Sequence, residues 1–177
     1  MPTQTPHSVR LHTWIDAMVR LGYRIAYRLW RIYLQIDRRE THGAQVAVIH
    51  QGRILITKSS YRDSYSLPGG YLKSGETSAD CAKRELMEEV GLDIMSCLLR
   101  PAFKATSQCN GHIGQDVIFE YRPDIEPEIC IDNREIVFAG FVDMFTALQL
   151  PVDGLVRQYI IRYFSSIKTW PDSGVAS

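Results

Sequence analysis

Apolar residues recur along the chain with the periods of strands and helices. Residues 44–50 and 53–58 are apolar, β-branched runs, and Gln51-Gly52 between them predicts a hairpin. The same criteria predict three further strands, over residues 95–105, 116–122 and 135–142. Helical spacing predicts a closing helix with an apolar stripe formed by Leu155, Tyr159, Tyr163, Phe164 and Ile167. Strands interleaved with helices predict an α/β fold, a layered α/β/α sandwich around a mixed β-sheet.

A strongly amphipathic helix is predicted over residues 11–36, either continuous or bent into two near Gly22. Its apolar stripe contains Trp14, Met18, Leu21, Ile25, Leu29, Ile32 and Ile36, and a second stripe contains Arg20, Arg24, Arg28 and Arg31. Residues 1–40 hold seven Arg, no Lys and three acidic residues, a charge of +4 that leaves −4 for the rest of the neutral chain. The four arginines interrupt the apolar stretch, which argues against a membrane-spanning helix.

Three interpretations of this N-terminal helix remain open. The preferred one is packing on the chain's own domain or across a homodimer, with the apolar stripe buried, and we expect a homodimer. Peripheral contact with an anionic membrane surface agrees with the Arg and Trp content. Contact with RNA or an acidic partner is the third, although the balanced overall charge argues against a nucleic-acid-binding protein.

The segment from Gly70 to Leu92 carries the chemistry. Within it, Glu85, Glu88 and Glu89 stand at positions i, i+3 and i+4 of a helix predicted over residues 78–90, so they project from one face. Like charges at this spacing destabilise a helix unless a positive group lies against them. Carboxylate oxygens are hard ligands, so the pattern predicts a Mg²⁺ or Mn²⁺ site.

The flanks of this helix predict a rigid site. Thr77 and Asp80 have the spacing of a capping box, and Gly91 is suited to end the helix. Before the helix, Gly69 and Gly70 allow the backbone to approach a ligand closely. A glycine loop that leads into a helix beside a metal-binding face is typical of a diphosphate-binding site.

Residues 70–92 resemble the Nudix hydrolase signature at every defined position: glycine, five residues, glutamate, seven residues, then Arg-Glu-apolar-any-Glu-Glu-any-Gly-apolar. Leu67-Pro68 before the signature and Leu150-Pro151 after the last predicted strand are similar to the family too. We therefore expect three parts: an amphipathic helical extension (1–42), a Nudix domain of the MutT-like type (43–168) and a flexible tail (169–177).

The resemblance implies a role for each matching residue. Glu85, Glu88 and Glu89 would bind the divalent metal ion together with the carbonyl group of Gly69. Arg84 would orient these glutamates through a salt bridge, and Glu76 would be its acidic partner or support the metal ligands. The activity implied is metal-dependent hydrolysis of a phosphoanhydride in a nucleoside diphosphate linked to another moiety, such as a nucleotide or a nucleotide sugar.

The general base and the substrate contacts are less closely defined. Glu85 or a glutamate of a later loop would accept the proton, and the loop candidates are Glu126, Glu128 and Glu135. Glu135 is preferred because it precedes an apolar strand. We expect substrate contacts from five residues near the glycine loop: Lys58, Arg62, Tyr65, Gly69 and Gly70. Isolated basic residues are more often merely solvated, and tyrosines in such a loop are as often part of the core.

Two alternatives to a small-nucleotide hydrolase stay open. One is a sensor that binds a nucleotide or nucleotide sugar without turnover, and the complete set of glutamates argues against it. The other is an enzyme that removes pyrophosphate from RNA 5′ ends. Specificity would depend on the segments 59–66, 107–114 and 123–133, of which 107–114 is expected to be a loop over the site.

Composition agrees with an intracellular enzyme. A chain of 177 residues is long enough for one domain with a true core plus an extension. The four cysteines lack CxxC spacing, which argues against a disulfide framework. The N-terminus lacks the apolar run of a signal peptide, so the expected location is the cytoplasm.

Overall fold

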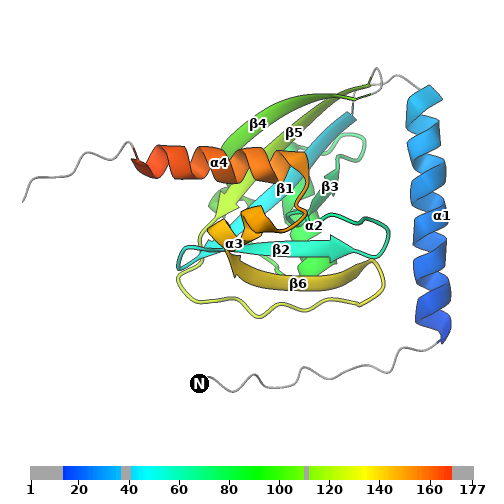
Figure 1. The fold of residues 1–177 in the computed structure, drawn as a ribbon, viewed down its shortest axis with the longest axis horizontal. Helices are drawn as coiled ribbons and strands as arrows, with labels where there is room; N and C mark the ends of the chain where they lie inside the picture. Colours follow the sequence, from blue (N-terminus) through cyan, green and yellow to red (C-terminus); the bar gives the residue numbers. More distant parts are fainter. Residues whose placement is uncertain (1–13, 37–40, 110–111, 169–177) are drawn as a thin grey trace, which may run out of the picture.

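The computed structural model describes residues 14–36, 41–109 and 112–168 of the chain. Its centre is a six-stranded sheet with the order β4-β5-β1-β2-β6, in which β3 also pairs with β1 (Figure 1). The strands are β1 (Thr41–His50), β2 (Arg53–Ser59), β3 (Gly69–Tyr71), β4 (Arg100–Cys109), β5 (His112–Tyr121) and β6 (Ile136–Asp143). Strands β1 and β5 run parallel and the other pairs run antiparallel, which confirms a mixed sheet.

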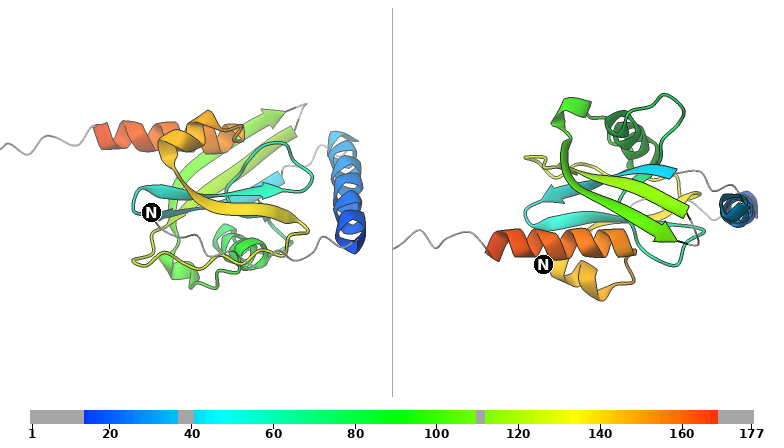
Figure 2. Two further views of the ribbon diagram at one scale, coloured as in Figure 1. Left: turned by 60° about the horizontal axis from the view of Figure 1, so that its bottom comes forward. Right: turned by 90° about the horizontal axis from the view of Figure 1, so that it is seen from above.

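Four α-helices accompany the sheet in the described ranges: α1 (Trp14–Ile36), α2 (Ser78–Val90), α3 (Met144–Gln149) and α4 (Gly154–Lys168). Helix α2 covers one face, while α3 and α4 cover the other (Figure 2). Strand β1 is buried on both faces, because Val46 and Val48 pack with Leu86 of α2 whereas Ile49 packs with Ile160 of α4. The predicted α/β/α sandwich is therefore confirmed.

Local sequence signals account for the hairpin and for the ends of α2. Gln51 and Gly52 both have positive φ angles, 49° and 76°, as a two-residue hairpin turn requires. The hydroxyl group of Thr77 accepts a hydrogen bond from the backbone N–H of Asp80 (3.2 Å), so the predicted N-cap is confirmed. Gly91 ends α2 in the left-handed conformation with φ 73°, as predicted.

Two predictions about the segment after α2 were wrong. The strand expected over residues 95–105 begins only at Arg100, after a short 3₁₀ turn (Ser96–Leu98). The loop expected over 107–114 is instead strand at 107–109 and at 112–114, because β4 and β5 pair as far as Cys109 opposite His112. A polar composition favours a loop, but pairing between the two strands satisfies the backbone N–H and C=O groups here. Helix α3 was not predicted.

Helix α1 is a single helix through Gly22, so the alternative of two helices is wrong. It stands beside the sheet at one side of the molecule (Figure 1). No helix in the described ranges is long and apolar enough to cross a bilayer. Some of the predicted features lie outside what the structure describes. They are residues 11–13 of the predicted helix, the side chains of Ile32, Ile36 and Ile167, and the expected tail (169–177).

Candidate active site

Two of the three helical glutamates face a cavity of about 510 Å³ between α2, β3 and α1, called here the glutamate cavity. Glu85 and Glu89 enter it from α2, and Glu135 enters it from the segment just before β6. The cavity is lined by Tyr23, Ala26, Tyr27, Tyr61, Arg62, Gly69, Gly70, Tyr71, Glu85, Glu89 and Glu135. Three carboxylates from two distant parts of the chain thus share one cavity.

The two carboxylates that α2 places in this cavity, Glu85 and Glu89, hold their protons more strongly than exposed ones. Burial raises the pKa of Glu89 to about 8, and the charges of Glu85 and Glu135 add to the rise, against one hydrogen bond from the N–H of Gly69 (3.1 Å). Burial also raises the pKa of Glu85, although hydrogen bonding to Arg84 opposes the shift. Buried carboxylates that repel one another are stabilised by a positive ion, and their hard oxygens suit Mg²⁺ or Mn²⁺. The donor set of the cavity therefore fits a divalent cation.

Arg84 binds three acidic side chains of the segment. Its guanidinium binds Glu76 twice (Nε–Oε1 2.8 Å, Nη2–Oε2 3.0 Å) and reaches Glu85 (2.5 Å) and Glu88 (3.1 Å) through Nη1. These bonds, with the N–H of Lys73, lower the pKa of Glu76 to about 2, and bonding to Glu76 raises that of Arg84. The bidentate pair with Glu76 fixes the guanidinium of Arg84. Arg84 in turn holds the carboxylate of Glu85 in place from outside the cavity.

The structure does not bring all three glutamates of α2 to one point. Glu88 is half exposed, binds Arg84 and Lys73, and is not among the residues that line the cavity. Within the described ranges, no group of three or more His, Cys, Asp or Glu side chains is close enough together to hold a metal ion. Helical spacing put Glu85, Glu88 and Glu89 on one face, but a face that spans three residues is wide enough for Glu88 to point to solvent.

The glycine loop lies directly against the glutamates. The backbone N–H of Gly69 donates to Glu89, and a Cβ atom on Gly70 would collide with the carboxylate of Glu85. Strand β3 is held in place by pairing with β1, with Gly70 opposite Ala44. The absence of side chains at these two positions is therefore what lets the loop and α2 form one wall of the cavity.

Of the loop glutamates, only Glu135 lines the glutamate cavity. Its Oε1 accepts a hydrogen bond from the hydroxyl group of Tyr61 (3.0 Å). Burial, and then the charge of Glu135, raises the pKa of Tyr61 well above its usual range, so this phenol remains a donor. Glu126 instead pairs with Arg53 at the surface, and Glu128 is exposed.

Three side chains were expected to contact the substrate. Of these, Arg62 lies beside Gly69 and Gly70, whereas Lys58 and Tyr65 do not. Arg62, Gly69 and Gly70 border both the glutamate cavity and a second cavity of about 380 Å³, called here the sheet cavity. The Nε atom of Arg62 is buried without a hydrogen-bond partner. Lys58 lies over the ring of Tyr65 (5.0 Å to the centroid), and neither of these residues lines either cavity.

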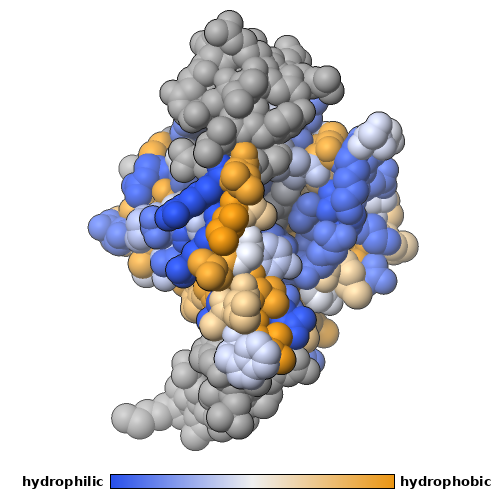
Figure 3. Space-filling model, turned by 90° about the vertical axis from the view of Figure 1, so that its right-hand side faces the viewer, coloured by the Kyte–Doolittle hydropathy of each residue, from blue (hydrophilic) through white to orange (hydrophobic). Residues whose placement is uncertain are grey.

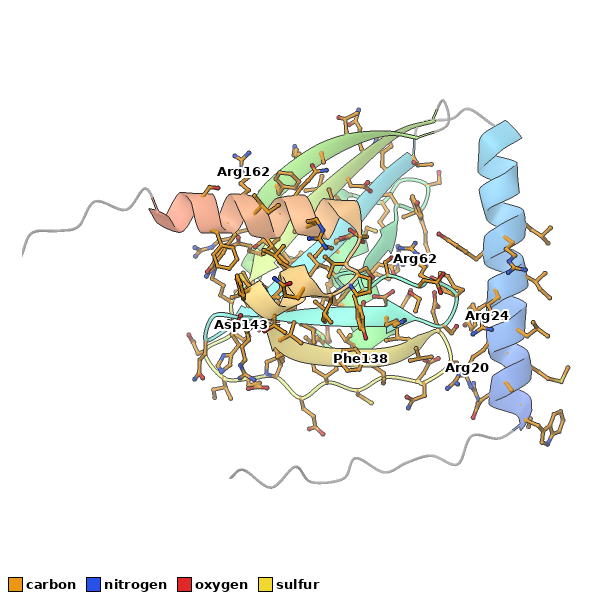
Figure 4. The ribbon with its side chains drawn as sticks, viewed as in Figure 1. Arg20, Arg24, Arg62, Phe138, Asp143 and Arg162 are labelled. Atoms are coloured by element: carbon orange, nitrogen blue, oxygen red, sulfur yellow. The ribbon has the colours of Figure 1, made fainter. Side chains whose placement is uncertain are left out.

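Sequence reasoning missed the contribution of α1 to the glutamate cavity. Tyr23 and Tyr27 line it from the helix, and the ring of Tyr27 lies 4.8 Å from that of Tyr61. Figure 4 shows Arg20 and Arg24 reaching from the helix toward the domain, where they donate to the backbone oxygens of Asn133 (2.6 Å) and Ser60 (3.0 Å). The signal was present in the i, i+4 spacing of the tyrosines and arginines opposite the apolar stripe, but we expected the apolar stripe to be the packed face.

Comparison with known proteins decides the family. The family model described as the NUDIX domain matches residues 40–162. The chain belongs to the Nudix family. A relative from Chromobacterium violaceum, the NAD-capped RNA hydrolase NudC, is 30% identical to this Nudix protein over 124 residues, which are 68% of this chain and 44% of that one. The chain thus spans less than half the length of this curated relative.

Solved structures of low sequence identity share the fold. The MutT protein from Methanosarcina mazei Go1 aligns with a TM-score of 0.64 at 15% identity, over 75% of this chain and 98% of that chain. A MutT NUDIX hydrolase from Burkholderia pseudomallei aligns with a TM-score of 0.61 at 19% identity, over 70% and 97%. A bifunctional NMN adenylyltransferase/ADP ribose pyrophosphatase from Francisella tularensis, complexed with AMP and a Mn ion, aligns with a TM-score of 0.60 at 18% identity, over 87% and 49%.

Proposed function

We propose that this Nudix protein is a divalent-metal-dependent pyrophosphohydrolase that cleaves the phosphoanhydride of a nucleoside diphosphate linked to another moiety. The observation that carries the proposal is the glutamate cavity, which Glu85, Glu89 and Glu135 line beside the glycine loop. The names of the relatives support the reaction class, because they include a hydrolase of NAD-capped RNA and an ADP ribose pyrophosphatase.

The metal ion would be held by Glu85 and Glu89, with the Gly69 carbonyl and Glu88 as the further ligands that the family signature implies. A divalent cation there supplies charge neutralisation at the phosphate oxygens and a water molecule of lowered pKa. Glu135 accepts the proton of the attacking water, while the hydroxyl group of Tyr61 fixes its carboxylate. The water oxygen forms a new bond to phosphorus as the bridging P–O bond breaks, which releases two phosphorylated products.

The two cavities suggest how the substrate lies. Arg62 and the glycine loop border both, so a diphosphate that passes along Gly69 and Gly70 reaches from one cavity to the other. The partly buried guanidinium of Arg62 offers positive charge and an unpartnered Nε–H at this point. The sheet cavity presents Gln45, Asp116 and Asp153. We assign it to the nucleoside, whose hydroxyl and amino groups bind such acceptors.

The test is a panel of nucleoside triphosphates, nucleotide sugars, dinucleotides, and capped or triphosphorylated RNA, assayed for product release with Mg²⁺ and with Mn²⁺. We expect turnover of one class by the wild type. Glu85→Gln and Glu89→Gln should lower kcat by a factor of about 100 or more, as loss of a group that stabilises transition-state charge does. The matched control is Glu128→Gln, because this exposed loop glutamate lies outside the cavity. Equal rates in all four proteins would refute the proposal.

A non-catalytic sensor is the alternative that this panel separates. It predicts tight binding of one nucleotide without release of product at any metal concentration. Calorimetry with the non-hydrolysed ligands of the same panel then distinguishes a sensor from an unfolded or inactive preparation. The triphosphorylated RNA in the panel tests removal of pyrophosphate from 5′ ends, and the capped RNA tests the substrate class named for the Chromobacterium violaceum relative.

A further inference from the structure

The apolar stripe of α1 points away from the domain. Five large apolar side chains of the stripe, together with Ile15 beside it, are between 47% and 73% exposed: Trp14, Ile15, Met18, Leu21, Ile25 and Leu29. Figure 3 shows orange surface that runs along the helix with blue surface beside it. We had expected the chain's own domain or a second copy to cover this stripe, and the domain does not. A contiguous exposed apolar ridge of this kind marks an interaction surface.

The opposite face of α1 fixes this orientation. Arg20 donates from both Nε (3.1 Å) and Nη2 (2.6 Å) to the backbone oxygen of Asn133, and Arg134 pairs with Asp16 (3.2 Å). Tyr27 stacks at 4.8 Å on Tyr61. The polar and aromatic face is thus anchored on the domain, and rotation of the apolar stripe onto the domain would break all of these contacts.

The charge along the edge of the stripe indicates what covers it. Arg28 is exposed and follows Ile25 by three residues, so it borders the apolar ridge, whereas Arg24 donates to the backbone oxygen of Ser60. Residues 14–29 contain three Arg and a single acid, Asp16, whose charge is already paired with Arg134. Helices with an apolar face and arginines on the polar face lie in the interface of bilayers that contain anionic lipids.

A second copy of the chain fits the stripe less well. A two-stranded coiled coil repeats its seam every seven residues, and Arg28 falls at the seam position that follows Trp14 and Leu21. The six exposed apolar residues are also few beside the roughly 20–30 residues per side of a stable protein–protein interface. The apolar ridge runs along a helix at one side of the molecule (Figures 1 and 3). A flat surface, such as that of a bilayer, can therefore contact the whole length of the ridge.

We propose that α1 is an interfacial helix that holds the protein on an anionic lipid surface through this apolar face. The indole of Trp14 and the aliphatic side chains enter the boundary between headgroups and acyl chains, while Arg28 contacts lipid phosphates. Because Tyr23 and Tyr27 on the inner face line the glutamate cavity, membrane binding brings that cavity to within about 10–12 Å of the headgroups, the diameter of one helix.

The experiment is cosedimentation of the full chain with vesicles of phosphatidylcholine alone or with 30% phosphatidylglycerol. We expect the wild type to bind the anionic vesicles, more weakly at high salt, and to bind the neutral vesicles poorly. The double variant Leu21→Glu/Ile25→Glu should lose binding by a factor of about ten or more, because it buries charge in place of apolar surface. Arg28→Ala should weaken binding about fivefold, the equivalent of ~1 kcal/mol for each basic residue near an anionic surface.

The matched control is Ile161→Glu, since Ile161 is 52% exposed on α4, away from α1. This variant should bind like the wild type. Circular dichroism and thermal unfolding show whether each variant is folded. Failure of the folded wild type to sediment with anionic vesicles overturns the proposal. So does a wild-type dimer in light scattering that Leu21→Glu/Ile25→Glu converts to a monomer without any vesicle binding, since the stripe is then an interface between two copies.

Discussion

The guanidinium carbon of Arg62 lies 5.4 Å from the centre of the Tyr27 ring, and this contact joins α1 to the glutamate cavity. The same guanidinium lies 5.8 Å from the ring of Tyr61. An arginine held over two aromatic faces keeps its charge while its position is fixed. The helix outside the family match is thereby a part of the site, because it supplies one of the surfaces that place Arg62.

Replacement of Tyr27 should weaken substrate binding. Without the ring, Arg62 loses a cation–π contact of about 0.5–2 kcal/mol, so Tyr27→Ala should raise KM by a factor of about 2 to 30. Tyr27→Phe keeps the aromatic face and should behave like the wild type. Steady-state kinetics on the substrate identified by the panel measure both. An unchanged KM in Tyr27→Ala would show that Arg62 does not depend on α1.

A methyl group at Gly70 should damage the site without unfolding the protein. The Cβ of Gly70→Ala would collide with the carboxylate of Glu85, which Arg84 holds from the other side. We expect Mn²⁺ affinity and kcat to fall by a factor of about 10–100, as they do when the groups that orient metal ligands are disturbed. Calorimetric titration with Mn²⁺ checks the first and the kinetic assay the second.

The control for that variant is Gly22→Ala. No atom lies within 4 Å of the added Cβ at this position of α1. Alanine is favoured over glycine inside a helix by about 0.5–1 kcal/mol, so this variant should be equally active and slightly more stable. A similar loss in both variants would mean that the Gly70 effect is not specific to Glu85.

The stability of the metal-free protein should depend on pH through Glu89. Its pKa is about 8 when folded, against an ordinary value of 4.5. Between these values the folded state binds more protons than the unfolded state, so the free energy of unfolding falls as the pH rises from about 4.5 to about 8. Urea unfolding in chelator should therefore give a lower stability at pH 8 than at pH 5.5, and Glu89→Gln, which stays neutral, should show a flatter profile.

Metal binding should have the opposite dependence on pH. The carboxylates must lose their protons to bind a cation, so Mn²⁺ affinity should rise over the same interval with release of protons. Titrations in two buffers of different ionisation enthalpy measure that release. A pH-independent affinity would mean that Glu89 is not a ligand.

Truncation of a side chain in α2 should lower the stability strongly at Leu86 and little at the next residue, Met87. Leu86 is fully buried against the sheet, so Leu86→Ala should cost about 2–5 kcal/mol of unfolding free energy. Met87 is 52% exposed, and Met87→Ala should change it by no more than about 0.5 kcal/mol. Denaturant unfolding distinguishes the two, and equal losses would contradict the orientation of α2.

Local signals in the sequence were enough for the elements that depend on neighbours along the chain. The capped helix from Ser78 to Val90 and the hairpin at Gln51-Gly52 follow from side-chain caps and from turn residues that accept positive φ. The signature from Gly70 to Leu92 also placed the chain in its family. These properties depend on residues that are close together in the chain, so they can be predicted from the sequence alone.

The tertiary structure decided the rest. Glu85 and Glu88 share a helix face, but only contact with β3 sends one into the cavity and leaves the other with Lys73 in solvent. The glutamate cavity is also lined by Glu135 and Tyr27, which lie far apart in the sequence. The amphipathic pattern of α1 fixed which residues share a face. Which face packs on the domain was settled by Asn133, Ser60 and Tyr61, residues that no local pattern connects to the helix.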